Sequence, residues 1–187
     1  IASIGIKWSH PESATLFGDG AAAVIIEQTP KTESSSIRHS DLKTYGRGAE
    51  LSRCLGGGNK HHPREFAAYP ERFVFDMNGP GIYRMAAKLL PNFVQQLFTP
   101  LDLTMDNMDL VIPHQASLMA MRLLSKQLKI PAEKLMSIAP THGNTMAASI
   151  PMALHEAIHQ GQLCRGDTAL LLGTGAGLSL GGIVLEY

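Results

Sequence analysis

The sequence predicts an α/β domain in which helices cover the faces of a mixed five-stranded sheet. Two observations carry this prediction. Short apolar runs typical of strands alternate with longer segments whose apolar residues recur at helical spacing. Their order along the chain is strand, long loop, strand, helix, strand, helix, strand, helix, strand, strand. Such alternation is typical of layered α/β domains.

Bulk composition limits the classes of function. The chain has 187 residues, of which 44% are hydrophobic and 17% charged, so it can build the core of one domain or somewhat more. The 16 basic and 16 acidic residues cancel, which removes the usual electrostatic case for nucleic acid or an anionic membrane as main partner. No apolar run reaches the roughly 18 residues that a membrane span needs.

The cysteines and the start of the chain indicate the expected compartment and whether the chain is part of a longer protein. Cys54 and Cys164 form no metal or redox motif, and the sequence alone leaves a disulfide between them open. With no signal-like start, a reducing cytoplasm is the expected compartment. The chain begins without an initiator Met, so we expect it to be a piece of a longer polypeptide.

The first part of the chain predicts a turn, a strand and a long loop. Residues 16–28 read LFGDGAAAVIIEQ, which predicts a tight turn followed by a buried strand over 21–27. Residues 29–72 are rich in Ser, Gly, Pro and charge, so we expect a long excursion with a short helix around 47–55. Loops of this length inside a compact domain are usually functional or mobile.

Regular elements are predicted for the rest of the chain. Apolar residues at helical spacing indicate helices over 79–98, 116–129 and 144–161. Pro91 should bend the first helix and Gly161 should end the last. Short apolar runs predict strands over 73–77, 108–114, 167–173 and 178–187, and 132–139 predicts a helical turn followed by a strand.

Polar or glycine residues follow three of these strands, where ligands of α/β sheets usually bind. His114 directly follows an apolar strand, and Asn144 opens a helix after the strand near 135–139. A glycine loop, GTGAG at 173–177, joins the last two strands. One helix and one strand separate His114 from Asn144, which could place both at neighbouring strand ends, facing one pocket.

Each of these segments also has a purely structural interpretation. His114 could simply cap the next helix, Asn144 is a favoured N-cap residue, and the glycines of 173–177 could only form a turn. HEAIH at 155–159 matches the H-E-x-x-H pattern of zinc proteases, but its polar residues lie toward the polar side of the helix and no obvious third ligand follows. We interpret it as a solvated helix face, and the tandem histidines 61–62 as surface residues of the long loop.

Three blocks, in this order, resemble the C-terminal half of the β-ketoacyl-acyl-carrier-protein synthase III family: VIPHQAS, THGNTMAASIPMALHEAI and LLLGTGAGLSLGGIVLEY. LFGDGAAAVIIE resembles the strand that opens that half. The resemblance runs over nearly the whole chain and is weakest in 29–72. It implies that residues 1–187 are the C-terminal domain of a thiolase-like fold with five αβαβα layers, usually a homodimer. The N-terminal half is then absent from this chain.

The resemblance also implies an activity. The family condenses an acyl thioester with malonyl-acyl carrier protein, with loss of CO2, in fatty acid biosynthesis. A Cys takes the acyl group, and a His and an Asn serve the decarboxylation. By motif match, His114 and Asn144 would be this pair, acting as neutral N–H donors to the developing enolate. In the glycine loop, which includes Gly175 and Gly177, the backbone N–H of Ala176 would contribute to a second oxyanion hole.

The resemblance implies no metal and no cofactor, only thioesters of coenzyme A or acyl carrier protein as substrates. The family's nucleophilic Cys lies in the N-terminal half, at a helix start where the dipole lowers a thiol pKa. Neither Cys54 nor Cys164 matches it. The chain alone is therefore expected to be inactive and to need the N-terminal half of the same enzyme as partner.

Several departures from the family concern substrate contacts. Ser117 stands where the family has an Asn that braces the site. GPGIY stands where the family often has GNEVF, so Gly79 remains a candidate site residue while Pro80 cannot supply the Asn contact to the pantetheine arm. Leu178 and Leu180 replace bulky aromatic residues, which could admit a longer or different acyl chain.

Partners and alternatives follow from the same resemblance. A basic patch of Arg84, Arg122, Lys126 and Lys129 on two predicted helices could dock an acidic carrier protein, although a solvated helix face explains these residues equally well. Alternative activities are head-to-head condensation of long acyl chains and secondary-metabolite ketosynthesis. Alternatives of other classes are a noncatalytic dimerisation or binding module and a zinc hydrolase.

Overall fold

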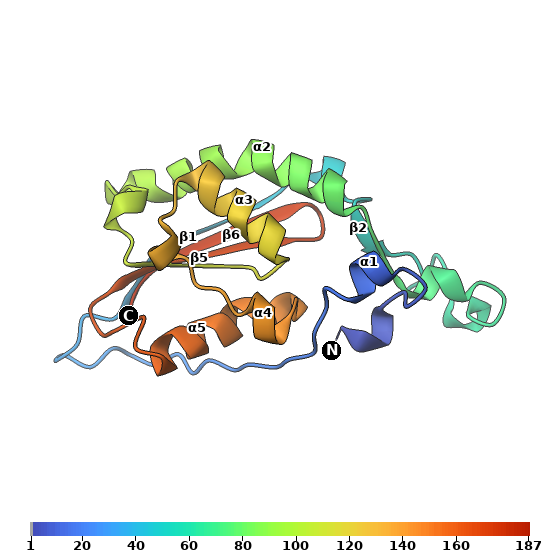
Figure 1. Ribbon diagram of the computed structural model, residues 1–187, viewed down its shortest axis with the longest axis horizontal. Helices are drawn as coiled ribbons and strands as arrows, with labels where there is room; N and C mark the ends of the chain where they lie inside the picture. Colours follow the sequence, from blue (N-terminus) through green and yellow to red (C-terminus); the bar gives the residue numbers. More distant parts are fainter. Residues whose placement is uncertain (1) are drawn as a thin grey trace.

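A four-stranded mixed sheet organises the protein, with strands in the order β1-β6-β5-β4 (Figure 1). The computed structural model describes residues 2–187, with Ser13 described by its backbone alone. β4 pairs with β5 in parallel, and the other two ladders are antiparallel. The strands of this sheet are β1 (Ser36–Thr44), β4 (Leu110–Pro113), β5 (Thr168–Gly175) and β6 (Ser179–Glu186). β2 (Ser52–Cys54) and β3 (Phe75–Met77) form a separate antiparallel ladder.

Helices lie on both faces of the sheet (Figure 1). α2 (Gly79–Phe98) and α3 (Leu118–Leu128) cover one face, whereas α5 (Ser149–His159) lies on the other, with the short α4 (Ala139–His142) beside it. The short α1 (Pro11–Ala14) lies near the N-terminus. The predicted class, a mixed sheet with helices on its faces, is therefore confirmed, although the sheet has four strands rather than five.

α2 spans the predicted residues 79–98 because its apolar stripe and its cap agree. The Asn78 side chain caps the first turn by accepting a hydrogen bond from the Gly81 N–H at 2.9 Å. Six side chains of the stripe are buried, and Phe93 and Leu97 among them are completely so. They pack on Leu180 and Val184 of β6 in the larger of two core clusters that flank the sheet. Pro91 lies inside α2 without ending it.

The second core cluster lies between the sheet and α5. Leu110 and Ile112 of β4 and Ala169 of β5 share this cluster with Ala153 and Ala157 of the helix. The small alanine side chains allow the helix to approach the sheet closely. α5 begins at Ser149, not at 144 as predicted, because a 3₁₀ turn over Met146–Ala148 precedes it.

The predicted buried strand at 21–27 is wrong. These residues pair with no strand among the described residues, and their apolar side chains face outward. Ile25 is 90% exposed and Val24 62% exposed. The segment follows Gly20, which lies against Met152 of α5, and in the view of Figure 1 the helix is drawn between this segment and the sheet. Its composition is that of a strand, but a strand requires a neighbour with which to share hydrogen bonds.

Two further expectations need correction. The predicted excursion 29–72 contains β1 and β2, and 47–55 forms a 3₁₀ turn and then β2 rather than a helix. The predicted strand near 135–139 is reduced to one parallel bridge, between Val111 and Leu135. Within residues 2–187, no helix combines the length and the apolarity needed to cross a membrane.

Candidate active site

The parallel pairing of β4 and β5 brings His114 next to the glycine loop. Pro113, the last residue of β4, pairs with Leu172 of β5. The His114 backbone N–H then donates to the Leu172 carbonyl at 2.8 Å. Because parallel strands end at the same edge of a sheet, His114 leaves β4 where β5 continues into Gly173–Gly175.

The His114 imidazole is largely buried and bonded to the first residue of α5. Its Nδ1 lies 2.7 Å from the Ser149 Oγ, and Ser149 is completely buried. Burial lowers the pKa of His114 below its usual value near 6.5, because the charged form loses its hydration. The imidazole is therefore neutral at pH 7, the form in which one ring nitrogen is an N–H donor and the other an acceptor.

Gln115 joins β4 to the segment that leads to Asn144. Its completely buried side chain donates from Nε2 to the carbonyls of Pro113 at 2.8 Å and Met136 at 3.3 Å. Its Oε1 accepts from the N–H groups of Ile138 at 2.9 Å and Ala139 at 3.1 Å. The Gln115 side chain thus supplies hydrogen bonds between the end of β4 and residues 136–139, where the predicted strand is absent. Sequence reasoning overlooked Gln115, although a polar residue directly after a buried strand was a usable signal.

Asn144 is held by its backbone and by its side-chain oxygen. Its N–H donates to the Leu16 carbonyl at 2.8 Å, and its carbonyl accepts from the Gly18 N–H at 3.1 Å. A Cβ on Gly18 would overlap the His142 carbonyl oxygen, so only glycine permits this approach. The Asn144 Oδ1 accepts from the Met146 N–H at 2.9 Å. Asn144 therefore caps the turn before α5, and the interpretation of Asn144 as the N-cap of that helix is wrong.

One short segment connects the two candidate donors. Asn144 begins it, and Ser149, which contacts the His114 ring, ends it. The Oδ1 atom of Asn144 already accepts a hydrogen bond within the chain. A ligand would therefore be bound by the amide N–H groups of the same side chain. The arrangement offers two neutral donors, a combination suited to stabilising negative charge on an oxygen without supplying a strong acid.

The glycine loop forms the hairpin turn between β5 and β6. Gly175 and Ala176 are exposed, and Gly177 has a φ of +137°, a conformation that side chains rarely adopt. The next side chains, Leu178 and Leu180, are buried in the core beneath α2. Both side chains pack in this core, and the expectation that they admit a longer or different acyl chain stays a prediction.

The remaining candidate residues lie on α2 and α3. Ser117 caps α3, its hydroxyl accepting from the Ala120 N–H at 3.1 Å. Gly79 is the first residue of α2. The four basic residues predicted for carrier docking are all exposed, one on α2 and the others on or just after α3: Arg84, Arg122, Lys126 and Lys129.

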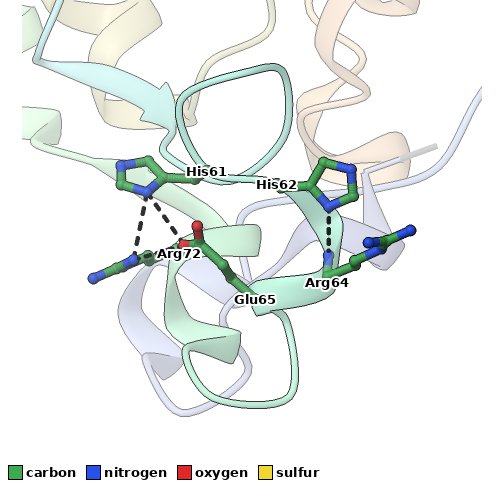
Figure 2. Close-up of polar contacts among 5 residues, drawn as sticks. All are labelled: His61, His62, Arg64, Glu65 and Arg72. Atoms are coloured by element: carbon green, nitrogen blue, oxygen red, sulfur yellow. Dashed lines mark hydrogen bonds and ion pairs between the residues drawn. The ribbon is translucent and has the colours of Figure 1, made fainter.

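The tandem histidines of the loop have different surroundings (Figure 2). His62 is exposed and accepts from the Arg64 N–H at 3.2 Å, whereas the half-buried His61 lies 3.5 Å from the Glu65 carboxylate. Arg72 pairs with the same carboxylate at 3.0 Å. The surface prediction therefore holds for His62 and only in part for His61. These ion pairs link residues 61, 65 and 72 of the loop to one another. None of the three residues is close to His114 in the sequence.

The zinc-like motif on α5 has no metal-binding geometry. His155 and His159 are exposed, and their rings stack with centroids 6.1 Å apart. Among the described residues, no group of three or more His, Cys, Asp and Glu side chains is arranged to hold a metal ion. Cys54 and Cys164 are both free and exposed.

The mixed sheet with helices on both faces defines the class as a thiolase-like α/β domain. Two family models match the chain, 3-oxoacyl-[acyl-carrier-protein] synthase III over residues 1–46 and the C-terminal model of the same enzyme over 99–187. The chain belongs to the 3-oxoacyl-[acyl-carrier-protein] synthase III family.

Individual relatives agree. The β-ketoacyl-[acyl-carrier-protein] synthase III of Neisseria gonorrhoeae is 32% identical over 182 residues, which are 97% of this chain and 54% of that protein. The enzyme of the same name from a Synechocystis strain is 32% identical and matches 100% of this chain and 56% of its own. The crystal structure of 3-oxoacyl-[acyl-carrier-protein] synthase III from Aquifex aeolicus superposes with a TM-score of 0.84 at 31% identity, covering 99% of this chain and 55% of that one. The chain thus spans about half the length of the curated relatives it matches.

Proposed function

We propose that this chain is the C-terminal part of a condensing enzyme that joins an acyl thioester to malonyl-acyl carrier protein with loss of CO2. In this proposal, His114 and Asn144 are the His and Asn of a Cys-His-Asn site. The observation that carries it is that the segment 144–149 begins with Asn144 and ends with Ser149, whose hydroxyl contacts the His114 ring at the edge where β4 and β5 end. The names of the relatives supply the substrate class.

The chemistry requires neutral donors at one oxygen. When the malonyl carboxylate leaves as CO2, the electron pair of the broken C–C bond passes to the α-carbon and the thioester oxygen as an enolate. The imidazole N–H of His114 and the amide N–H of Asn144 stabilise this oxygen. The enolate carbon then attacks the acyl-cysteine carbonyl, and the cysteine leaves as thiolate. Burial of His114 serves this step, because a charged imidazolium would protonate the enolate.

The nucleophilic cysteine comes from an N-terminal half in this proposal. Cys54 lies on β2 and Cys164 in the turn before β5, and both are exposed. Neither lies at a helix N-terminus, where the dipole would lower a thiol pKa. The chain alone is therefore inactive, and it uses no cofactor besides its thioester substrates.

Apolar surface on both sides of α5 supports an N-terminal half as the partner of this chain. A groove of about 460 Å³ crosses the sheet beside α5, lined in part by Leu42, Leu171, Gly181 and Ile183. On the opposite side of α5, the unpaired apolar segment 21–27 is exposed. An element packed into the groove and a strand paired with 21–27 would enclose α5 between two sheets, as the αβαβα layering requires.

The remaining parts of the proposal concern assembly and location. The backbone N–H of Ala176 forms a second oxyanion hole for acyl transfer, and the exposed basic residues of α2 and α3 receive an acidic carrier protein. The complete enzyme is a cytoplasmic homodimer.

The test uses the full-length protein. His114→Ala and Asn144→Ala should each reduce malonyl-thioester decarboxylation by roughly 10²–10³-fold, the usual loss for one oxyanion donor. Transfer of a radiolabelled acyl group to the nucleophilic cysteine should be nearly unchanged. Matched controls are His155→Ala and Asn92→Ala, which remove the same side chains at exposed positions of α5 and α2. Decarboxylation at the unmodified rate in both site variants would refute the assignment. No acylation and no decarboxylation in the unmodified protein would instead favour a noncatalytic binding module.

A further inference from the structure

The Ser149 hydroxyl joins α5 to the segment that follows β4 at the candidate site. Ser149 is the first residue of α5 and is completely buried. Its Oγ lies 2.7 Å from Nδ1 of His114, and the Gln115 backbone N–H points to the same oxygen at 3.4 Å. The hydroxyl thus contacts both the imidazole and the end of β4.

Counting donors and acceptors determines the direction of these bonds. The Gln115 N–H can only donate, so Oγ accepts there. The hydroxyl has one proton, and within residues 2–187 the only other polar atom in hydrogen-bond contact with Oγ is Nδ1 of His114. If Nδ1 carried a proton, the buried hydroxyl would face two donors and have no acceptor for its own hydrogen. A buried donor without a partner is costly.

Two features of the surroundings oppose the charged imidazolium, in which Nδ1 would also be protonated. The ring rests at the N-terminal end of α5, where the helix dipole places positive partial charge. Burial lowers the pKa of His114, and no carboxylate contributes to that shift. The neutral ring, with the Ser149 hydroxyl donating to Nδ1, therefore carries its only proton on Nε2.

We propose that Ser149 is a positioning residue that fixes His114 in the Nε2–H tautomer, with Nδ1 as acceptor of the Ser149 hydroxyl. The consequence for the site rests on the proposed function. A ring held in this tautomer always presents an N–H to the enolate oxygen, whereas a ring free to exchange tautomers would present a lone pair for part of the time. Ser149 itself touches no reacting atom.

The first test reads the tautomer directly and needs no substrate. The full-length protein is labelled with ¹⁵N at its histidine rings, and the His114 signals are assigned by their absence in His114→Gln. In the unmodified protein, Nδ1 should resonate as an unprotonated nitrogen and Nε2 as a protonated one. Ser149→Ala should mix the two tautomers, and Ser149→Thr, which keeps the hydroxyl, should restore Nε2–H. A protonated Nδ1 in the unmodified protein, or an unchanged tautomer in Ser149→Ala, would overturn the proposal.

A matched control separates positioning from general loss of stability. Ser125→Ala removes a hydroxyl from α3 that donates to the Ile130 carbonyl at 2.7 Å, and it should leave the His114 signals unchanged. If Ser149→Ala does not fold, the unmodified protein and Ser149→Thr still test the proposal, because a protonated Nδ1 in either would overturn it.

The second test measures the reaction. Ser149→Ala should lower malonyl decarboxylation by roughly 3- to 10-fold, the loss expected from one ordering hydrogen bond, and leave acylation of the cysteine unchanged. A tautomer change without a rate change would count against the proposed function of His114 and leave the structural role of Ser149 intact. An Nε2–H tautomer that persists in Ser149→Ala would count against the role of Ser149 and leave the proposed function of His114 intact.

Discussion

The two faces of the sheet differ in how completely this chain covers them. On the α2 face, Phe93 and Leu97 seal the strands, and their contacts on β6 are completely buried. On the α5 face, the helix contacts β4 and β5, whereas β1 and β6 border an open groove. Leu42, on β1 in that groove, is 74% exposed. The α2 face is a closed hydrophobic core. The α5 face has apolar residues as well, but no element within residues 2–187 covers those of β1 and β6.

β6 contributes residues both to the covered face and to the open face of the sheet. Leu180, Gly182 and Val184 point toward α2 and are buried, whereas Gly181 and Ile183 alternate with them and line the groove. A strand that is apolar on both faces is typical of sheets buried on both sides. The difference between the faces therefore indicates where a further layer belongs, and it predicts unequal responses to mutation.

The largest expected effect is on the covered face. Phe93→Ala removes a completely buried ring and should lower the free energy of unfolding of the 187-residue chain by about 3–5 kcal/mol. Leu42→Ala, on the open face, should change it by less than about 0.5 kcal/mol. Urea unfolding of both variants provides the comparison. Equal losses would mean that the groove is closed in solution.

The same distinction explains which elements could be predicted from sequence. α2, β4, β5 and β6 find their packing partners within the chain, so apolar periodicity was sufficient for them. The segment 21–27 has equally apolar residues but no partner among the described residues, and it stays exposed. β1 was overlooked because it is an edge strand of polar composition, SIRHSDLKT, in which exposed residues predominate.

The candidate site was predictable to a similar degree. His114 and Asn144 follow from their position after apolar runs and from the motifs around them. The role of Ser149 could not be predicted, because a residue's local sequence does not reveal a hydrogen bond to another element, whereas Gln115 had a signal in its position just after a buried strand. The Ser149 hydroxyl meets His114 only after the chain has run through α3 and α4. Ser149 looks like an ordinary residue at a helix start in the sequence.

An intermediate effect separates two adjacent glycines of β6. A Cβ on Gly182 would lie 2.6 Å from a methyl carbon of Leu97, so Gly182→Ala should lower the free energy of unfolding by about 1–3 kcal/mol through overpacking. Gly181→Ala is the matched control, since its Cβ would meet only the exposed Leu42 side chain at 3.2 Å and should be nearly neutral. Thermal or urea unfolding would measure both. Similar losses in the two variants would contradict the assignment of opposite faces.

The smallest expected effect concerns pH and the polar edge of the α5 face. Burial lowers the pKa of His114 in the folded chain, so between that pKa and about 6.5 the unfolded chain binds a proton that the folded chain does not. This contribution to stability is present above about pH 6.5 and is lost as the pH falls toward the folded pKa, by less than about 1.4 kcal/mol per pH unit.

His114→Gln should remove this part of the pH dependence, which urea unfolding at about pH 7.5 and about pH 5.5 would measure as a smaller difference than in the unmodified chain. The pKa of Asp19 is lowered by hydrogen bonds from Ser3, so its contribution falls in a separate window below about pH 4. An identical difference in both proteins would mean that His114 is as hydrated in the folded chain as in the unfolded one. The open face would then admit water as far as the ring, and the contrast between a covered and an uncovered face would extend to the candidate site itself.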